Sequence, residues 1–186
     1  SAASTVLLKN DGGLLPLPQG KKIVVIGYAS ENAITHGAGS GNVAASRLTT
    51  PLAGIREAAG EGAQITYAGT DMKLARKLLE DADYAIVFVG ASGTEMLDRH
   101  SLSLDLGCVE YLGVNLVMTM VGMGGDAHPS CLGVNPFFEM SQSKAVLEVA
   151  KAKPGKTIVV ASVPGAVLMP WSGNVSSILT NFLPGQ

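Results

Sequence analysis

The sequence has little charge of either sign and no excess of one. Charged residues make up 15% of the 186 positions, and 13 Lys and Arg side chains stand against 15 Asp and Glu, for a formal net charge of -2. No run of basic residues breaks this balance. Nucleic acids and anionic membranes attract basic patches, so neither is an expected partner.

A long uninterrupted hydrophobic run is also absent. The stretch closest to a membrane span, YLGVNLVMTMVGMGG at 111–125, is shorter than the ~20 residues a transmembrane helix needs and contains glycines. The first residues include no Met and no charged segment followed by an apolar one, as a signal peptide would. We expect no membrane span, and a chain that begins inside a longer polypeptide.

Cysteine is scarce, and several catalytic motifs are missing. Cys108 and Cys131 form either one disulfide or two buried thiols, and their spacing does not decide between these. With Asp126 and His128 they offer zinc ligands, but a single His-x-x-Cys lacks the second Cys pair that makes such a site specific. No Walker lysine and no G-x-S-x-G elbow occur. We expect no metal, no cofactor and no serine hydrolase.

What the sequence does contain is 47% hydrophobic residues and 23 glycines. Apolar runs without polar alternation are typical of strands that are covered on both faces. Such runs lie at 21–27, 63–69, 83–90, 155–165 and 175–185. Their alternation with helical patterns predicts an α/β fold: an open, mostly parallel sheet of about five or six strands with helices on both faces, an α/β sandwich of flavodoxin-like type.

Helices are predicted at 50–60, 71–82 and 141–152. The first has Thr50 as cap, Pro51 at the first position and a closing glycine, and the last opens at Ser141 or Ser143. Two segments depart from the alternation. Residues 1–17 are interpreted as a short helix and a proline-rich strap. Residues 105–140 are interpreted as an insertion with its own structure or a functional loop, because connections of about 2–6 residues are usual. We treat 1–186 as a single domain.

The loop after the first predicted strand is rich in glycine. Gly37, Gly39 and Gly41, around Ser40, would let backbone N–H groups approach a ligand closely. A dinucleotide fingerprint needs G-x-G-x-x-G directly after the strand, whereas this G-x-G-x-G comes later. A flexible or packing loop is therefore favoured over a nucleotide site.

The loop after the strand at 83–90 carries most of the interesting charge, in GASGTEMLDRH. A carboxylate at the top of such a sheet serves as a general acid if burial raises its pKa. Asp98 and Arg99 would pair and leave Glu95 free. From spacing alone, a solvated loop is favoured over catalysis. Trp171 is interpreted as a packing residue rather than a platform for sugars.

Several motifs occur in a specific order: VLLKNDGGLLPLPQGKKIVVIG, GAGSGNV, DYAIVFVGASGTEMLDRHSLSL, SQSKAVLEVAKAKPGKTIVVASVPGAVLMPW and ILTNFLPGQ. Together they resemble the second, α/β-sandwich domain of the family 3 glycoside hydrolases, the β-glucosidase and β-xylosidase group. The opening K-N-x-x-x-L-L-P-L and the closing P-G-Q are specific when found in this order. The resemblance covers most of the chain.

The resemblance implies a retaining β-glycosidase that hydrolyses terminal β-linked sugars. Its acid/base would be Glu95, because SGTEMLDR aligns with the family pattern S-G-E-G-x-D-R, and Asp98 and Arg99 would support it. The loop from Gly37 to Gly41 would help shape the sugar site against an N-terminal barrel domain that carries the Asp nucleophile. This barrel is absent from the chain, so the chain alone is not expected to be active.

A second hypothesis is a non-catalytic structural or binding module within a larger assembly. It rests on the absent nucleophile, on Thr94 and Met96 where many relatives have glycine, and on the insertion at 105–140. This insertion would wall the active site, contact a partner chain or cover an edge of the sheet. The resemblance also implies a secreted, periplasmic or vacuolar protein, and the sequon NVS begins at Asn174.

Overall fold

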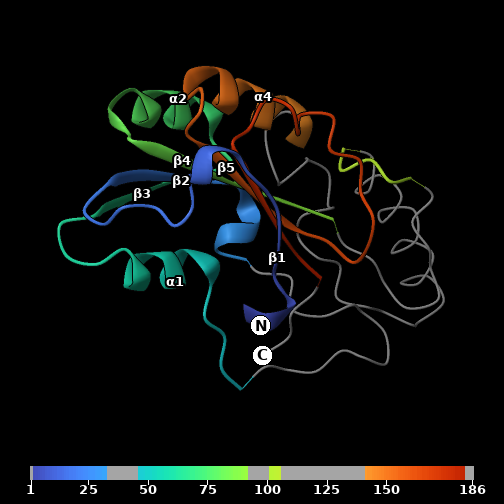
Figure 1. Ribbon diagram of the computed structural model, residues 1–186, viewed down its shortest axis with the longest axis horizontal. Coiled ribbons are helices and arrows are strands. Elements are labelled where there is room, and N and C mark those ends of the chain that lie inside the picture. The colour runs from blue at the N-terminus through green and yellow to red at the C-terminus, as the bar shows by residue number, and fades with distance from the viewer. Residues whose placement is uncertain (1, 33–45, 92–100, 106–140, 183–186) are drawn as a thin grey trace, which may run out of the picture.

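The computed structural model describes residues 2–32, 46–91, 101–105 and 141–182. These residues form a six-stranded sheet in the order β1-β6-β5-β4-β2-β3 (Figure 1). Its strands are β1 (Val6–Asn10), β2 (Lys22–Ile26), β3 (Gln64–Gly69), β4 (Tyr84–Gly90), β5 (Thr157–Ser162) and β6 (Ser177–Asn181). All neighbours are parallel except β1 and β6, which pair antiparallel. The predicted fold class is confirmed.

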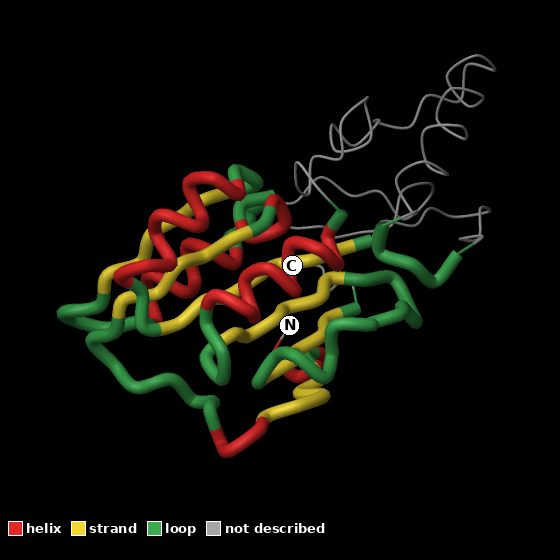
Figure 2. Tube along the Cα trace, turned by 90° about the horizontal axis from the view of Figure 1, so that it is seen from above, coloured by secondary structure: helices red, strands yellow, loops and turns green. Residues whose placement is uncertain are grey.

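Helices cover both faces of the sheet. α1 (Pro51–Ala58) lies on one side, and α2 (Met72–Asp81) and α4 (Gln142–Ala152) lie on the other (Figure 1). Figure 2 shows the same sheet from above, with its strands side by side. Short 3-10 helices complete the described chain: η1 (Ala2–Ser4), η2 (Asp11–Gly13) and η3 (Tyr28–Ser30).

Side-chain caps fix where the three longer helices begin. The Thr50 hydroxyl accepts a hydrogen bond from Ala53 N at 3.2 Å, and Asp71 Oδ1 accepts from two backbone N–H groups at the start of α2. For α4 the cap is Ser141, whose Oγ accepts from Lys144 N at 3.1 Å. Caps of this kind satisfy N–H groups that have no partner within the helix. The structure therefore selects Ser141 over Ser143.

The core consists of two layers, one on each face of the sheet. Alternate residues of β2 and β4 point to opposite faces, so both faces of these strands are apolar. Val24, Val87 and Val89 pack in the layer under α2 and α4, whereas Val25 and Phe88 pack in the layer over α1. This two-sided burial explains why the predicted strands show no polar alternation.

The N-terminal segment corrects one expectation. Residues 6–10 do not form a helix or a strap but strand β1, which pairs with the outer edge of β6. The Asn10 side chain fixes the turn that follows: Oδ1 accepts from Leu15 N at 2.9 Å and from Ser177 Oγ at 2.9 Å, and Nδ2 donates to Leu15 O at 3.0 Å. An edge strand covered on one side only leaves Leu7 and Leu8 exposed, so its pattern resembles neither a buried strand nor an amphipathic helix.

Two further expectations concern the end of the chain and the insertion. Trp171 is 0% exposed in the layer under α2 and α4, which confirms it as a packing residue. Asn174 of the sequon is exposed in the turn before β6, while Ser176 is buried. Of the predicted insertion at 105–140, only Asp105 lies within the described residues. The division into one domain with an insertion stays a prediction.

Candidate functional site

The predicted site residues lie outside the described residues. They are Glu95, Asp98, Arg99, Gly37, Gly39, Ser40, Gly41, Cys108 and Cys131. Their roles, and the question of a disulfide, therefore stay predictions. What the structure does describe is the framework from which the two predicted loops leave and to which both return.

Both loops leave the sheet at its topological switch point. β2 and β4 are parallel neighbours, and Ile26 near the end of β2 pairs with Val87 of β4. From β2 the chain continues to β3 on one side, and from β4 it continues to β5 on the other. In open parallel sheets, ligands bind outside the carboxyl ends of the strands at such a point. The loop holding Gly37 to Gly41 follows β2, and the loop holding Glu95 follows β4.

The chain leaves β2 through a glycine that packs directly on β4. Gly27 has φ +108°, and a Cβ atom at this position would overlap the carbonyl oxygen of Phe88. Its N–H donates to Gly69 O at 2.7 Å, and its carbonyl accepts from the Ser30 hydroxyl at 2.8 Å. The exit of β2 is thus held between β3 and β4.

The exit of β4 is held by a buried amide on α4. Gln142 is only 1% exposed. Its Oε1 accepts from Gly90 N at 2.8 Å, and its Nε2 donates to Gly90 O at 2.9 Å and to Leu104 O at 2.7 Å. No sequence pattern singles this residue out, because a glutamine in the first turn of a helix is ordinarily exposed.

The segment 101–105, where the chain returns after the Glu95 loop, is attached to two elements. Asp105 Oδ1 accepts a hydrogen bond from Ser143 N, in the first turn of α4, at 3.1 Å. The helix dipole favours a carboxylate at this end of a helix. Leu102 O accepts from Leu168 N at 2.8 Å, and Ser103 forms a parallel bridge with Leu168. The returning chain is therefore fixed to α4 on one side and to the segment after β5 on the other.

A hollow of about 390 Å³ lies beside this attachment. Its lining consists of Ser103, Asp105, Ser143, Leu168, Met169 and Pro170. The only carboxylate of this lining already accepts the Ser143 N–H bond. The hollow thus offers two hydroxyl-bearing side chains and an apolar wall at the edge of the sheet where the candidate loops begin.

Two tyrosines lie near the exit of β2. Burial raises the pKa of Tyr28, and burial together with the negative charge of Glu31 raises the pKa of Tyr67. Both phenols are therefore neutral at ordinary pH. A neutral phenol can donate a hydrogen bond but supplies no charge to the site.

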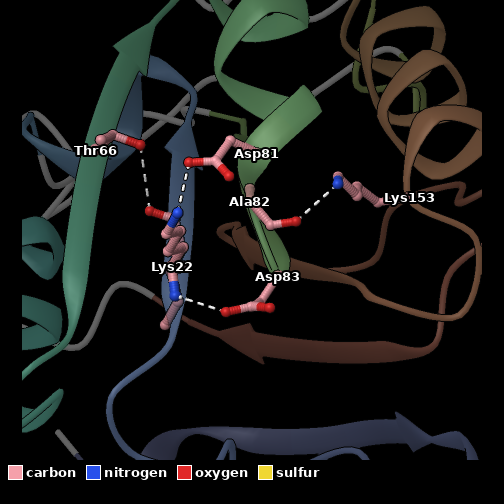
Figure 3. Close-up of polar contacts among 7 residues, drawn as sticks. Lys22, Thr66, Asp81, Ala82, Asp83 and Lys153 are labelled. Atoms are coloured by element: carbon pink, nitrogen blue, oxygen red, sulfur yellow. Dashed lines mark hydrogen bonds and ion pairs between the residues drawn. The ribbon is translucent and has the colours of Figure 1, made fainter.

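At the opposite, amino edge of the sheet, polar contacts tie the strand starts together (Figure 3). Asp83 Oδ2 accepts from Lys22 N at 2.9 Å, and Lys22 Nζ pairs with Asp81 at 2.6 Å. The backbone N–H bond lowers the pKa of Asp83, and the hydrogen bond to Asp81 raises that of Lys22. These perturbed groups lie at the wrong edge for the candidate loops, so we assign them to structure.

The part of the chain that the structure describes holds neither a cluster of metal ligands nor a membrane-spanning helix. In that part of the chain, no group of three or more His, Cys, Asp or Glu side chains is placed to hold a metal ion. Among the same residues, no helix is both long and apolar enough to cross a membrane.

The strand order and its switch point define a doubly wound, flavodoxin-like α/β domain. Within that class the comparison with protein families is specific. Residues 5–119 match the glycosyl hydrolase family 3 C-terminal domain, and the chain belongs to that family.

Curated relatives are β-glucosidases. The thermostable β-glucosidase B of Acetivibrio thermocellus is 26% identical over 201 aligned residues, which cover 100% of this chain and 22% of the relative. β-Glucosidase B of Emericella nidulans is 43% identical over 67 residues, 34% of this chain and 8% of the relative. The chain thus spans about a fifth or less of the length of these relatives.

Solved structures agree on the fold. A family 3 β-glucosidase from Neurospora crassa has a TM-score of 0.66 at 26% identity, covering 98% of this chain and 21% of that one. DesR, a β-glucosidase from Streptomyces venezuelae in complex with D-glucose, has a TM-score of 0.73 at 20% identity, covering 98% and 34%. The second likeness shows the fold alone.

Proposed function

We propose that this chain is the acid/base-bearing domain of a retaining, β-glucosidase-like enzyme that hydrolyses terminal β-linked sugars. The observation that carries the proposal is family membership, joined to the place of the Glu95 loop after β4 at the switch point of the sheet. An N-terminal barrel domain, outside this chain, would supply the Asp nucleophile. The β-glucosidase relatives support this class of substrate.

In the proposed reaction Glu95 acts twice. It first gives its proton to the glycosidic oxygen as the bond from that oxygen to the anomeric carbon breaks, and the Asp carboxylate bonds to the same carbon. Glu95, now ionised, then takes a proton from the water that displaces the Asp. Such a site needs two carboxyl groups about 5–5.5 Å apart, because one forms the covalent intermediate while the other transfers protons.

The neighbouring residues have supporting roles in this proposal. Asp98 and Arg99 would orient the loop and set the pKa of Glu95. The glycines at 37, 39 and 41, with Ser40, would let backbone groups approach the sugar closely where the domain faces the barrel. Both sets follow strands that end at the switch point.

The test is Glu95→Gln in the longer protein that includes the barrel. We expect turnover of β-glucosides with poor leaving groups to fall by about 10²–10⁴-fold, the usual contribution of general acid–base catalysis. Formation of the glycosyl–enzyme should be much less affected for a dinitrophenyl glucoside, because this leaving group departs without a proton. Glu148→Gln, the same change on α4, serves as the control. Wild-type turnover of the poor substrates by Glu95→Gln would refute the assignment.

A non-catalytic module of the same family is the second candidate. It is favoured by Thr94 and Met96, which replace the glycines that flank the Glu in the family pattern. In that case the complete native protein would show no β-glucosidase activity, and Met96→Gly with Thr94→Gly would not create any. Measurable activity that depends on Glu95 would exclude this alternative.

A further inference from the structure

The Gln142 side chain forms hydrogen bonds with the chain on both sides of the Glu95 loop. Gly90 is the last residue of β4, and Leu104 lies just after the loop. One amide group bonds to both: Oε1 to Gly90 N, and Nε2 to Gly90 O and Leu104 O, at 2.7–2.9 Å. Three hydrogen bonds from one buried side chain thus hold the two ends of the segment together.

The position of Gln142 is itself fixed. It is the first residue of α4, whose start is capped by Ser141 and by Asp105 from the returning chain. Since the residue is 1% exposed, water cannot readily replace the amide if it is removed. The backbone groups of Gly90 and Leu104 would then lose partners in a buried place.

We propose that Gln142 is a positioning residue for the acid/base, acting through the backbone of Gly90 and Leu104. This inference rests on the proposed function of Glu95. A loop whose ends are fixed has fewer conformations than one whose ends move, and proton transfer requires a narrow range of geometries. A displacement of about 1 Å can cost about 10²-fold in rate, so a fixed pair of loop ends has a catalytic consequence.

The first test is Gln142→Met in the complete protein, because Met preserves length and volume while removing all three hydrogen bonds. We expect turnover of poor-leaving-group glucosides to fall by about 10- to 100-fold, with a smaller change in KM. Glycosyl–enzyme formation from the dinitrophenyl glucoside should change less. Thr157→Val is the matched control. Thr157 is also 1% exposed, and the substitution removes the hydrogen bond that its hydroxyl donates to Lys153 O, at the amino edge of the sheet.

A second variant guards against simple misfolding. Gln142→Glu keeps the acceptor for Gly90 N, but it donates to Leu104 O or Gly90 O only when protonated. Turnover of poor substrates by this variant should therefore fall more steeply with rising pH than in the wild type. An unchanged pH profile in a folded Gln142→Glu protein would overturn the proposal.

A double-mutant cycle separates this inference from the proposed function. If Gln142 acts through Glu95, Gln142→Met should cost much less in the Glu95→Gln background than in the wild type. If Glu95→Gln itself has wild-type turnover, the proposed function fails. If Glu95→Gln is impaired but Gln142→Met costs the same in both backgrounds, or behaves as Thr157→Val does, only the positioning role fails.

Discussion

Gly27 carries a backbone requirement that no other residue type meets. Its φ of +108° is strained for any side chain, and a Cβ would overlap the Phe88 carbonyl of β4. We expect Gly27→Ala to lower the free energy of unfolding by about 2–4 kcal/mol, because strain adds to the clash between strands. Chemical denaturation measures this change.

Gly54 provides the matched control for that substitution. It lies inside α1, and a Cβ there would meet nothing within 4 Å. Gly54→Ala should therefore raise the free energy of unfolding by about 0.5–1 kcal/mol, since alanine loses less backbone entropy in a helix. A similar effect of both substitutions would contradict the account given for Gly27.

Sequence patterns identify the role of a single residue where that role depends on near neighbours in the chain. Thr50 was predicted as a cap, and Ser141 as one of two candidates, because such cap hydrogen bonds span only three residues. Gln142 and Asn10 were not, because their partners lie far along the chain or depend on a turn. No local pattern encodes those contacts. The resemblance singled out Glu95, but its environment lies outside the described residues.

Asp83, just before β4, accepts a hydrogen bond from Lys22 N at the start of β2 and so links the starts of the two strands. This bond lowers the pKa of Asp83 below its ordinary value, so the folded chain binds its proton less readily than the unfolded chain does. The stabilisation is complete above the unfolded pKa and is lost as the pH falls through the lower folded pKa. Because Asp83 is partly exposed, solvent screening keeps the effect modest.

Two variants test this link between the strands. Asp83→Asn still accepts from Lys22 N but does not titrate, so its unfolding free energy should fall less than that of the wild type between neutral and acidic pH. Asp83→Ala removes the acceptor and should be less stable than Asp83→Asn at neutral pH. Urea titrations over this pH range measure both, and parallel pH profiles for wild type and Asp83→Asn would contradict the prediction.

Among the strands and helices, the parallel strands and the three longer helices were predictable and β1 was not. β2, β4 and β5 are buried on both faces, which makes their apolar runs continuous. β1 depends on the free edge of β6 at the far end of the sequence. Its strand state is decided by that pairing, so the local sequence led to the wrong element for residues 6–10.

The order of strands in the sheet brings together two loops that are separated in the sequence. Both loops leave at the β2–β4 switch point, so residues from both can contribute to one site. The chemistry of such a site depends on its side chains, because one fold hosts many functions.

The proposal that the two catalytic carboxylates lie on different domains predicts how the 186-residue chain behaves by itself. Because the nucleophile would lie on the barrel, the folded chain should release no product from aryl β-glucosides, and adding the separately purified barrel should restore activity. Circular dichroism with a cooperative thermal transition would show that the chain is folded. The Glu95→Gln chain, mixed with the same barrel, should restore far less activity on poor-leaving-group substrates. Turnover by the isolated chain that requires Glu95 would contradict the two-domain site and would demand a nucleophile within this chain.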